Sequence, residues 1–181
     1  IPQKNKNNKL FNRSLIIDPE GEIISSYDKI NLFDVFLSNK EKYIESKNYD
    51  SGKKISLSRL PWGNLGMTIC YDLRFPLLYK KLAKKGAHFF SIPAAFTYTT
   101  GISHWESLLR ARAIENGCFV FAPAQCGHHD NGRRTFGNSM IIDPWGKVLK
   151  RARNSIGSIS CDIDLEKVNF YRKRIPAMTK Y

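Results

Sequence analysis

The sequence predicts a layered α/β fold with a mixed sheet. Two observations lead to this prediction. Short alternating apolar runs flank turn sequences such as Asp-Pro-Glu-Gly and Pro-Trp-Gly-Asn, which is typical of hairpins. Further along, apolar strand-like runs alternate with segments of helical spacing, which favours parallel strands. The 181 residues are enough for one core, and we expect a single domain over residues 1–181.

The first half of the chain holds two predicted hairpins. Residues 14–17 and 22–27 are expected strands around the turn at residues 18–21. Residues 55–60 and 65–70 are expected to pair around the turn at residues 61–64.

The second half alternates strands and helices. A helix is expected over residues 74–85, with Pro76 in its first turn and Gly86 after its end, and another over residues 102–116, ended by Gly117. The other expected elements are strands over residues 87–92, 119–124, 138–142, 147–150 and 158–163, and a closing helix over residues 165–174.

The net charge of +13 raises the question of a nucleic-acid partner. The lysines are scattered and no recognition-helix or RNA-binding motif accompanies them, so we expect a solvated basic surface and no nucleic-acid binding. No apolar run approaches the length of a membrane span and no signal-peptide pattern is present. We therefore expect no membrane partner and a cytoplasmic location.

None of the four cysteines belongs to a Cys-x-x-Cys pair, which argues against zinc-ribbon and thioredoxin sites. Cys118 and Cys161 lie in apolar, strand-like runs, where a cysteine usually packs as a small hydrophobe. Cys70 differs, because it stands where a strand stops and a helix begins. There, N–H dipoles and Arg74 favour a thiolate, and the N–H of Tyr71 or Asp72 can face a developing oxyanion. On this local pattern alone, a buried structural cysteine is nearly as good an interpretation.

Candidate partners for Cys70 differ in quality. His88 opens a buried strand, and His104 begins a helix, where a structural or pocket role is expected. His128 and His129 are adjacent and rarely converge on one ion, so we expect no metal. Lys29 is better placed: it follows a strand and precedes apolar residues, and a positioned ammonium would stabilise an oxyanion. Glu45 could orient Lys29 or the substrate, although a strand-end lysine and a loop glutamate are also common at surfaces.

The ordered segments around these residues resemble the nitrilase superfamily of carbon–nitrogen hydrolases, and within it the Nit branch. The segments are YDKINLFD at residues 27–34, ES at 45–46, TICYDLRFP at 68–76, PAAF at 93–96, TG at 100–101, HWE at 104–106, LLRARAIE at 108–115, NSM at 138–140 and DPWG at 143–146. The resemblance covers nearly the whole chain. It implies a nitrilase-type α-β-β-α sandwich that is incomplete at its N-terminus.

The resemblance also implies a Glu–Lys–Cys triad. Lys29 matches the family lysine, Cys70 the nucleophile, and Glu45 the additional glutamate beside the triad. The general-base glutamate should lie upstream of this chain, so we expect a missing N-terminal part and an inactive fragment. The implied reaction is hydrolysis of an amide through a thioester on Cys70, with Lys29 and the Tyr71 N–H holding the oxyanion and with no metal or organic cofactor. Asn31 departs from the histidine that relatives commonly carry.

The substrate implied by the resemblance is a terminal amide of a small acidic or keto-acid compound. Residues 124–128 and 133–140 are most similar to deaminated-glutathione amidases, whereas residues 33–34 and 45–47 look as much like ω-amidases acting on α-ketoglutaramate-type substrates. Phe96 and Thr97 are expected to bind substrate, and a homodimer or larger homo-oligomer is expected. Four arginines could supply cationic contacts to the substrate: Arg110, Arg112, Arg133 and Arg134. For Arg110 and Arg112, which lie on a predicted helix, a structural role is favoured. A catalytically silent interaction subunit is the alternative.

Overall fold

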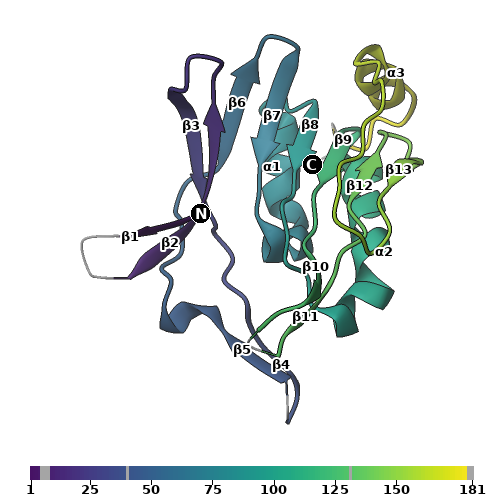
Figure 1. The fold of residues 1–181 in the computed structure, drawn as a ribbon. Helices are drawn as coiled ribbons and strands as arrows, with labels where there is room; N and C mark the ends of the chain where they lie inside the picture. The colour runs from purple at the N-terminus through teal and green to yellow at the C-terminus, as the bar shows by residue number, and fades with distance from the viewer. Residues whose placement is uncertain (5–8, 40, 131, 179–181) are drawn as a thin grey trace.

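The computed structural model describes residues 1–4, 9–39, 41–130 and 132–178. Its centre is a six-stranded sheet in the order β13-β12-β9-β8-β7-β6 (Figure 1). The strands are β6 (Ser56–Leu60), β7 (Gly63–Met67), β8 (Phe89–Ser91), β9 (Phe119–Ala122), β12 (Met140–Ile142) and β13 (Val148–Arg151). Strands β7, β8 and β9 are parallel and the outer pairs are antiparallel, which confirms the predicted mixed sheet.

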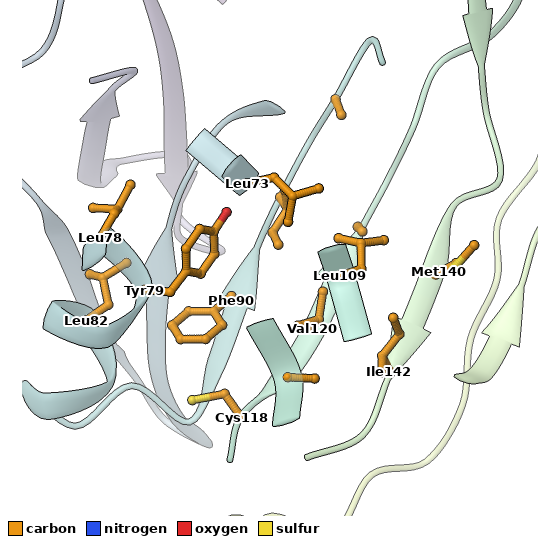
Figure 2. Packing of buried hydrophobic residues seen from close by; sticks show 14 of the residues in the cluster. Leu73, Leu78, Tyr79, Leu82, Phe90, Leu109, Cys118, Val120, Met140 and Ile142 are labelled. Atoms are coloured by element: carbon orange, nitrogen blue, oxygen red, sulfur yellow. The ribbon is translucent and has the colours of Figure 1, made fainter. Parts of the chain in front are cut away.

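Helices α1 (Pro76–Lys84) and α2 (Tyr98–Asn116) lie on one face of this sheet (Figure 1). Their inward side chains form one apolar cluster with alternate strand residues, among them Phe90 and Val120 (Figure 2). Successive strand residues point to opposite faces, and Phe119 accordingly joins a separate cluster on the other face. The helix-covered face therefore holds the larger part of the core.

The other face is covered by two separate elements. Helix α3 (Glu166–Arg174) packs Val168 against Phe89 and Phe119. The second element is an antiparallel three-stranded sheet whose strand β3 places Tyr27 against Met67 of β7 and against Ile69, two residues further on. Its strands are β1 (Pro2–Lys4), β2 (Leu10–Ile17) and β3 (Ile23–Asp28).

Two small hairpins lie near one another at the lower end of Figure 1. They are β4 (Asp34–Ser38) with β5 (Glu41–Ile44), which leads into the 3-10 helix η1 (Glu45–Lys47), and β10 (Cys126–His128) with β11 (Arg134–Phe136). This is the end toward which the parallel strands point, because the chain runs from β9 into β10, and Thr97, after β8, forms a bridge with Thr135 of β11. No helix in the described ranges is both long and apolar enough to cross a membrane.

Most predicted elements are confirmed with shifted ends, and two predictions need correction. The helix expected over residues 102–116 begins at Tyr98, because residues 98–101 already form its first turn after the extended residue Thr97. Residues 158–163 form no strand. Of the alternating residues Ile159, Cys161 and Ile163, Ile163 packs against the apolar cluster beneath α3. Cys118 is fully buried as predicted, whereas Cys161 is half-buried in that irregular segment.

Candidate active site

Cys70 lies just beyond the carboxyl end of β7. It opens the 3-10 helix η2 (Cys70–Arg74), which precedes α1, and its φ of 47° places it in the left-handed region. Its N–H donates to the Pro93 carbonyl at 3.0 Å, which anchors the turn to the segment after β8. A non-glycine residue held in this conformation costs free energy, and such residues cluster at functional sites. The backbone thus presents the thiol at the edge where the parallel strands end.

Lys29 is brought to the same place by the loop that follows β3. Its side chain is only 3% exposed, and its Nζ donates to Glu45 Oε2 at 2.5 Å. The backbone of Lys29 is fixed on both sides: its N–H donates to the Asn12 carbonyl at 2.9 Å, and its carbonyl accepts the Gly52 N–H at 2.8 Å. A buried ammonium in a fixed loop keeps its charge at one position, as an oxyanion-stabilising group requires.

Glu45 holds Lys29 from η1. Besides the lysine amine, its carboxylate accepts the Asn12 side-chain amide at 3.2 Å and the Phe33 N–H at 2.6 Å. Charge-assisted bonds of this kind fix a carboxylate firmly. The expected juxtaposition of Lys29, Glu45 and Cys70 is therefore present, with Glu45 directed at the lysine.

The surroundings of the Cys70 thiol shift its pKa in opposite directions. Burial raises the pKa of the thiol above its ordinary value, as does the Glu45 carboxylate to a smaller degree, while Lys29, the Ala95 N–H and Arg133 act to lower it. The net direction is upward. A raised pKa disfavours the thiolate, so a nucleophilic role requires a base to take the proton.

Tyr71 occupies the second position of η2. Of the two N–H groups considered for the oxyanion, that of Asp72 donates to the Ile69 carbonyl at 3.1 Å. The Tyr71 N–H comes earlier in the first turn, where helix N–H groups lack an acceptor within the helix, which leaves it suitable for an external oxygen. Its ring packs edge-on against Phe33, with centroids 5.0 Å apart, and against Phe75 at 5.4 Å. The predicted oxyanion donor is thus held by aromatic packing next to the thiol.

A cavity of about 1060 Å³ opens beside these residues, between the strands of the small sheet and the loops after β7, β8 and β9. Lys29, Glu45 and Cys70 line it, together with Arg133. The Arg133 guanidinium lies 5.2 Å from the centre of the Tyr43 ring, and its Nη2 donates to the Ala95 carbonyl at 2.5 Å. This places a cation in the wall of the cavity, near the thiol.

The other three arginines considered for substrate binding lie elsewhere. Arg112 is buried and bonds to the Leu73 carbonyl and Glu115, and Arg110 donates to the Gly146 carbonyl, which confirms their favoured structural roles. Arg134 lies over the Tyr98 ring, outside the lining of this cavity. Arg133 is therefore the member of the set that faces Cys70.

Phe96 and Thr97 lie close to Cys70 but are buried. Their exposed fractions are 4% and 1%, and the Thr97 hydroxyl is 2.7 Å from that of Thr100. They line a small void beside Cys70 and not the larger cavity, so direct substrate binding by them stays a prediction.

The histidines lie in separate surroundings. His88 accepts the Asn64 N–H, His104 contacts Arg74, and His129 contacts the Thr135 hydroxyl. In the described part of the chain, no three histidine, cysteine or acidic side chains are grouped as metal ligands would be.

One group of site residues was not predicted from the sequence. Asp72 is fully buried and accepts hydrogen bonds from Tyr27, Asn31 and Ile69. Asn31, noted only as a departure from related sequences, therefore supports the lysine loop by binding Asp72. The partners are 41 and 45 residues apart in the sequence, so no local spacing indicated the contact.

The fold and the site define an α/β protein with a lysine-supported cysteine at the end of its parallel strands. The chain belongs to the carbon–nitrogen hydrolase family, whose model matches residues 1–173. It is 43% identical to a deaminated glutathione amidase of Yersinia enterocolitica over 91% of this chain and 58% of that protein. It is 45% identical to a probable hydrolase nit2 of Schizosaccharomyces pombe over 99% of this chain and 66% of that protein.

Solved structures agree with this assignment. The C. elegans NitFhit protein aligns with a TM-score of 0.91 at 40% identity, covering 98% of this chain and 44% of that one. Saccharomyces cerevisiae Nit3, a member of branch 10 of the nitrilase superfamily, aligns with a TM-score of 0.88 at 30% identity, covering 99% and 63%. The predicted nitrilase-type fold and Nit-branch resemblance are confirmed. The chain spans between about two-fifths and two-thirds of the length of these four proteins.

Proposed function

We propose that the protein containing this chain is an amidase in which Cys70 is the nucleophile. The observation that carries the proposal is the strained Cys70 turn beside the buried Lys29–Glu45 pair, at the wall of an open cavity. Nucleophile, cation and space for a substrate are therefore brought together by three separate segments of the chain.

The proposed reaction begins when a base takes the Cys70 proton and the sulfur attacks the amide carbonyl. The Lys29 ammonium and the Tyr71 N–H stabilise the oxyanion, ammonia leaves, and water hydrolyses the thioester to a carboxylate. Glu45 already accepts three hydrogen bonds, one of them from the Lys29 amine. We therefore propose that Glu45 holds Lys29 in position. The base that accepts the thiol proton is then a different carboxylate of the whole protein.

The proposed substrate is the terminal amide of a small acidic or keto-acid compound resembling deaminated glutathione. The names of several relatives support this class, as does Arg133 in the cavity wall, because a guanidinium binds carboxylates well. An ω-amidase acting on α-ketoglutaramate-type compounds is the second candidate, since its substrate also joins a terminal amide to an anionic end.

The test is ammonia release by the protein expressed from its full coding sequence. We expect wild type to hydrolyse deaminated glutathione faster than α-ketoglutaramate, and both faster than a neutral amide of similar length. Cys70→Ala should abolish release, whereas Cys161→Ala, at a half-buried cysteine outside the cavity, should retain it. If wild type releases no ammonia from any of these amides, the amidase proposal fails and the silent-subunit alternative takes its place.

We further propose a cytoplasmic location and a homodimer or larger homo-oligomer for the whole protein. Four free cysteines suit a reducing compartment, and the assembly follows from the family resemblance. Cell fractionation and light scattering of the purified protein test these two points.

A further inference from the structure

Asp72 is a buried carboxylate that the proposed reaction does not use. It is 0% exposed and lies two residues after Cys70 in η2. Burying a carboxylate is costly unless hydrogen-bond donors satisfy its oxygens. Burial accordingly raises the pKa of Asp72, and the bonds from Ile69, Tyr27 and Asn31 act in the opposite direction.

The four hydrogen bonds to Asp72 come from both sides of the site. Oδ2 accepts the Tyr27 hydroxyl at 2.8 Å and the Ile69 N–H at 2.9 Å. Oδ1 accepts the Asn31 N–H at 3.0 Å and the Asn31 side-chain amide at 2.8 Å. The Tyr27 oxygen in turn accepts the Ile30 N–H at 3.2 Å. Both oxygens of the carboxylate are therefore fully used.

These donors bracket the two proposed catalytic side chains. Tyr27, Ile30 and Asn31 stand on either side of Lys29, and Ile69 stands immediately before Cys70. One carboxylate therefore joins the loop that carries the amine to the turn that carries the thiol. Among the described residues, β3 and β7 belong to different sheets, so strand pairing does not join the loop to the turn directly.

We propose that Asp72 is a positioning residue that sets the separation between the Lys29 amine and the Cys70 thiol, with Asn31 and Tyr27 as the side chains through which it holds the lysine loop. The role in catalysis rests on the proposed amidase function. The oxyanion must lie between amine and thiol, and misplacement of a catalytic group by about 1 Å reduces a rate by up to about a hundredfold.

Three substitutions weaken this connection to different degrees. Asp72→Asn replaces one acceptor oxygen by an NH₂ donor. Because both oxygens of Asp72 accept hydrogen bonds, the new NH₂ group faces N–H or O–H donors in either orientation of the amide. Asn31→Ala removes one of the two Asn31 bonds, and Tyr27→Phe removes the hydroxyl that links Asp72 to Ile30. The matched control is Asp143→Asn, a second buried aspartate, whose Oδ1 accepts two N–H groups in the turn between β12 and β13.

Two measurements on the full-length protein separate positioning from mere stability. The first is kcat and KM for amide hydrolysis. The second is the pH dependence of Cys70 alkylation by iodoacetamide, which requires no turnover and so reports on the site even if the amidase proposal fails. Lys29→Met serves as the background for a double-mutant cycle with Asp72→Asn.

We expect Asp72→Asn to lower kcat about 10- to 100-fold, with KM changed by no more than about twofold. Its alkylation midpoint should move to higher pH, because Lys29 no longer lies close enough to favour the thiolate. Asn31→Ala and Tyr27→Phe should show smaller shifts in the same direction. In the Lys29→Met background, Asp72→Asn should add no further shift.

The proposal is overturned if Asp72→Asn moves the alkylation midpoint no more than Asp143→Asn does, or if its shift adds fully to that of Lys29→Met. Should Asp72→Asn fail to fold, Asn31→Ala and Tyr27→Phe decide the matter by the same criteria. Wild-type midpoints in both of these variants would then reject the positioning role.

Discussion

The two faces of the six-stranded sheet are built from different chemistry. On the helix-covered face, Leu82, Phe90 and Trp105 are 0% exposed and belong to one apolar cluster. On the face toward the small sheet, the chain buries Lys29 and Asp72 and fixes them with hydrogen bonds. Apolar burial supplies most of the folding free energy, whereas buried polar groups contribute little net stability but fix geometry. The helix-covered face therefore holds the larger part of the apolar core, whereas the other face combines two smaller apolar clusters with the polar contacts of the candidate site.

After loss of the Cys70 thiol itself, Lys29→Met is expected to have the largest effect on the site face. Loss of a single oxyanion-stabilising donor typically lowers kcat about 10²- to 10³-fold. The substitution also leaves Glu45 half-buried without its ion pair, so the free energy of unfolding should fall. Ammonia release and urea unfolding of the full-length protein measure the two effects.

The double variant Lys29→Met/Glu45→Gln provides the control for this prediction. It removes both charges of the pair, so stability should recover while activity stays low. Recovery of activity in the double variant would show that Lys29 acts only by neutralising Glu45.

Leu82→Ala is the corresponding test of the helix face. Leu82 is 0% exposed, and truncation of a buried leucine costs about 2–5 kcal/mol of unfolding free energy. The alkylation profile of Cys70 should stay unchanged at temperatures where the variant is folded. Leu77→Ala on the same helix, where the side chain is 71% exposed, should cost less than about 0.5 kcal/mol. A shifted Cys70 profile in Leu82→Ala would mean that the two faces are coupled.

The two faces also differed in how far the sequence predicted them. On the helix face, periodic apolar residues and the glycines after each helix marked α1 and the end of α2, because local spacing determines which residues meet there. On the site face, Cys70, Lys29 and Glu45 were identified by chemistry and family resemblance, while their support by Asp72 was not. That support depends on hydrogen bonds between residues more than 40 positions apart in the sequence, which come together only in the folded structure.

The false strand at residues 158–163 has a related cause. Alternating apolar residues are typical of a strand, but a strand also needs a hydrogen-bonding neighbour. Within the described residues, the sheet edge at β13 pairs only with β12, and the segment packs its apolar side chains without joining the ladder.

Replacing a glycine by alanine on each face, at Gly52 and at Gly66, compares the two faces through the same chemical change. A Cβ at Gly52 would lie 2.1 Å from the Asp28 carbonyl oxygen, next to the bond between the Gly52 N–H and the Lys29 carbonyl. Since backbone must move, Gly52→Ala should cost about 1–3 kcal/mol and lower amidase activity as well.

At Gly66, a Cβ would meet the Phe90 ring at 2.9 Å, on the helix side of β7. Gly66→Ala should therefore reduce stability and leave the specific activity of the folded protein unchanged. Unfolding and activity assays of both variants check this contrast. Full activity in Gly52→Ala would contradict the prediction that this glycine supports the Lys29 loop.

The smallest expected effect lies at the end of the sheet opposite Cys70. His88 precedes β8, and its Nδ1 accepts the Asn64 N–H at 3.0 Å, a bond that only the neutral ring can make. Burial, assisted by the charge of Arg172, lowers the pKa of His88 below its ordinary value. The neutral ring therefore stabilises the fold above the unfolded-state pKa of about 6.5, and this contribution is lost as the pH falls through the lower folded-state pKa.

His88→Gln removes the titration, so the stability difference between wild type and variant should shrink between pH 8 and pH 5 in urea unfolding. An equal difference at both pH values would contradict the assignment. The pH profile of Cys70 alkylation should be the same in both proteins, because His88 stands just before β8 and contacts Asn64 at the amino end of β7, while the thiol lies at the carboxyl ends of the parallel strands. A changed profile would instead show that the sheet transmits charge effects from one end to the other.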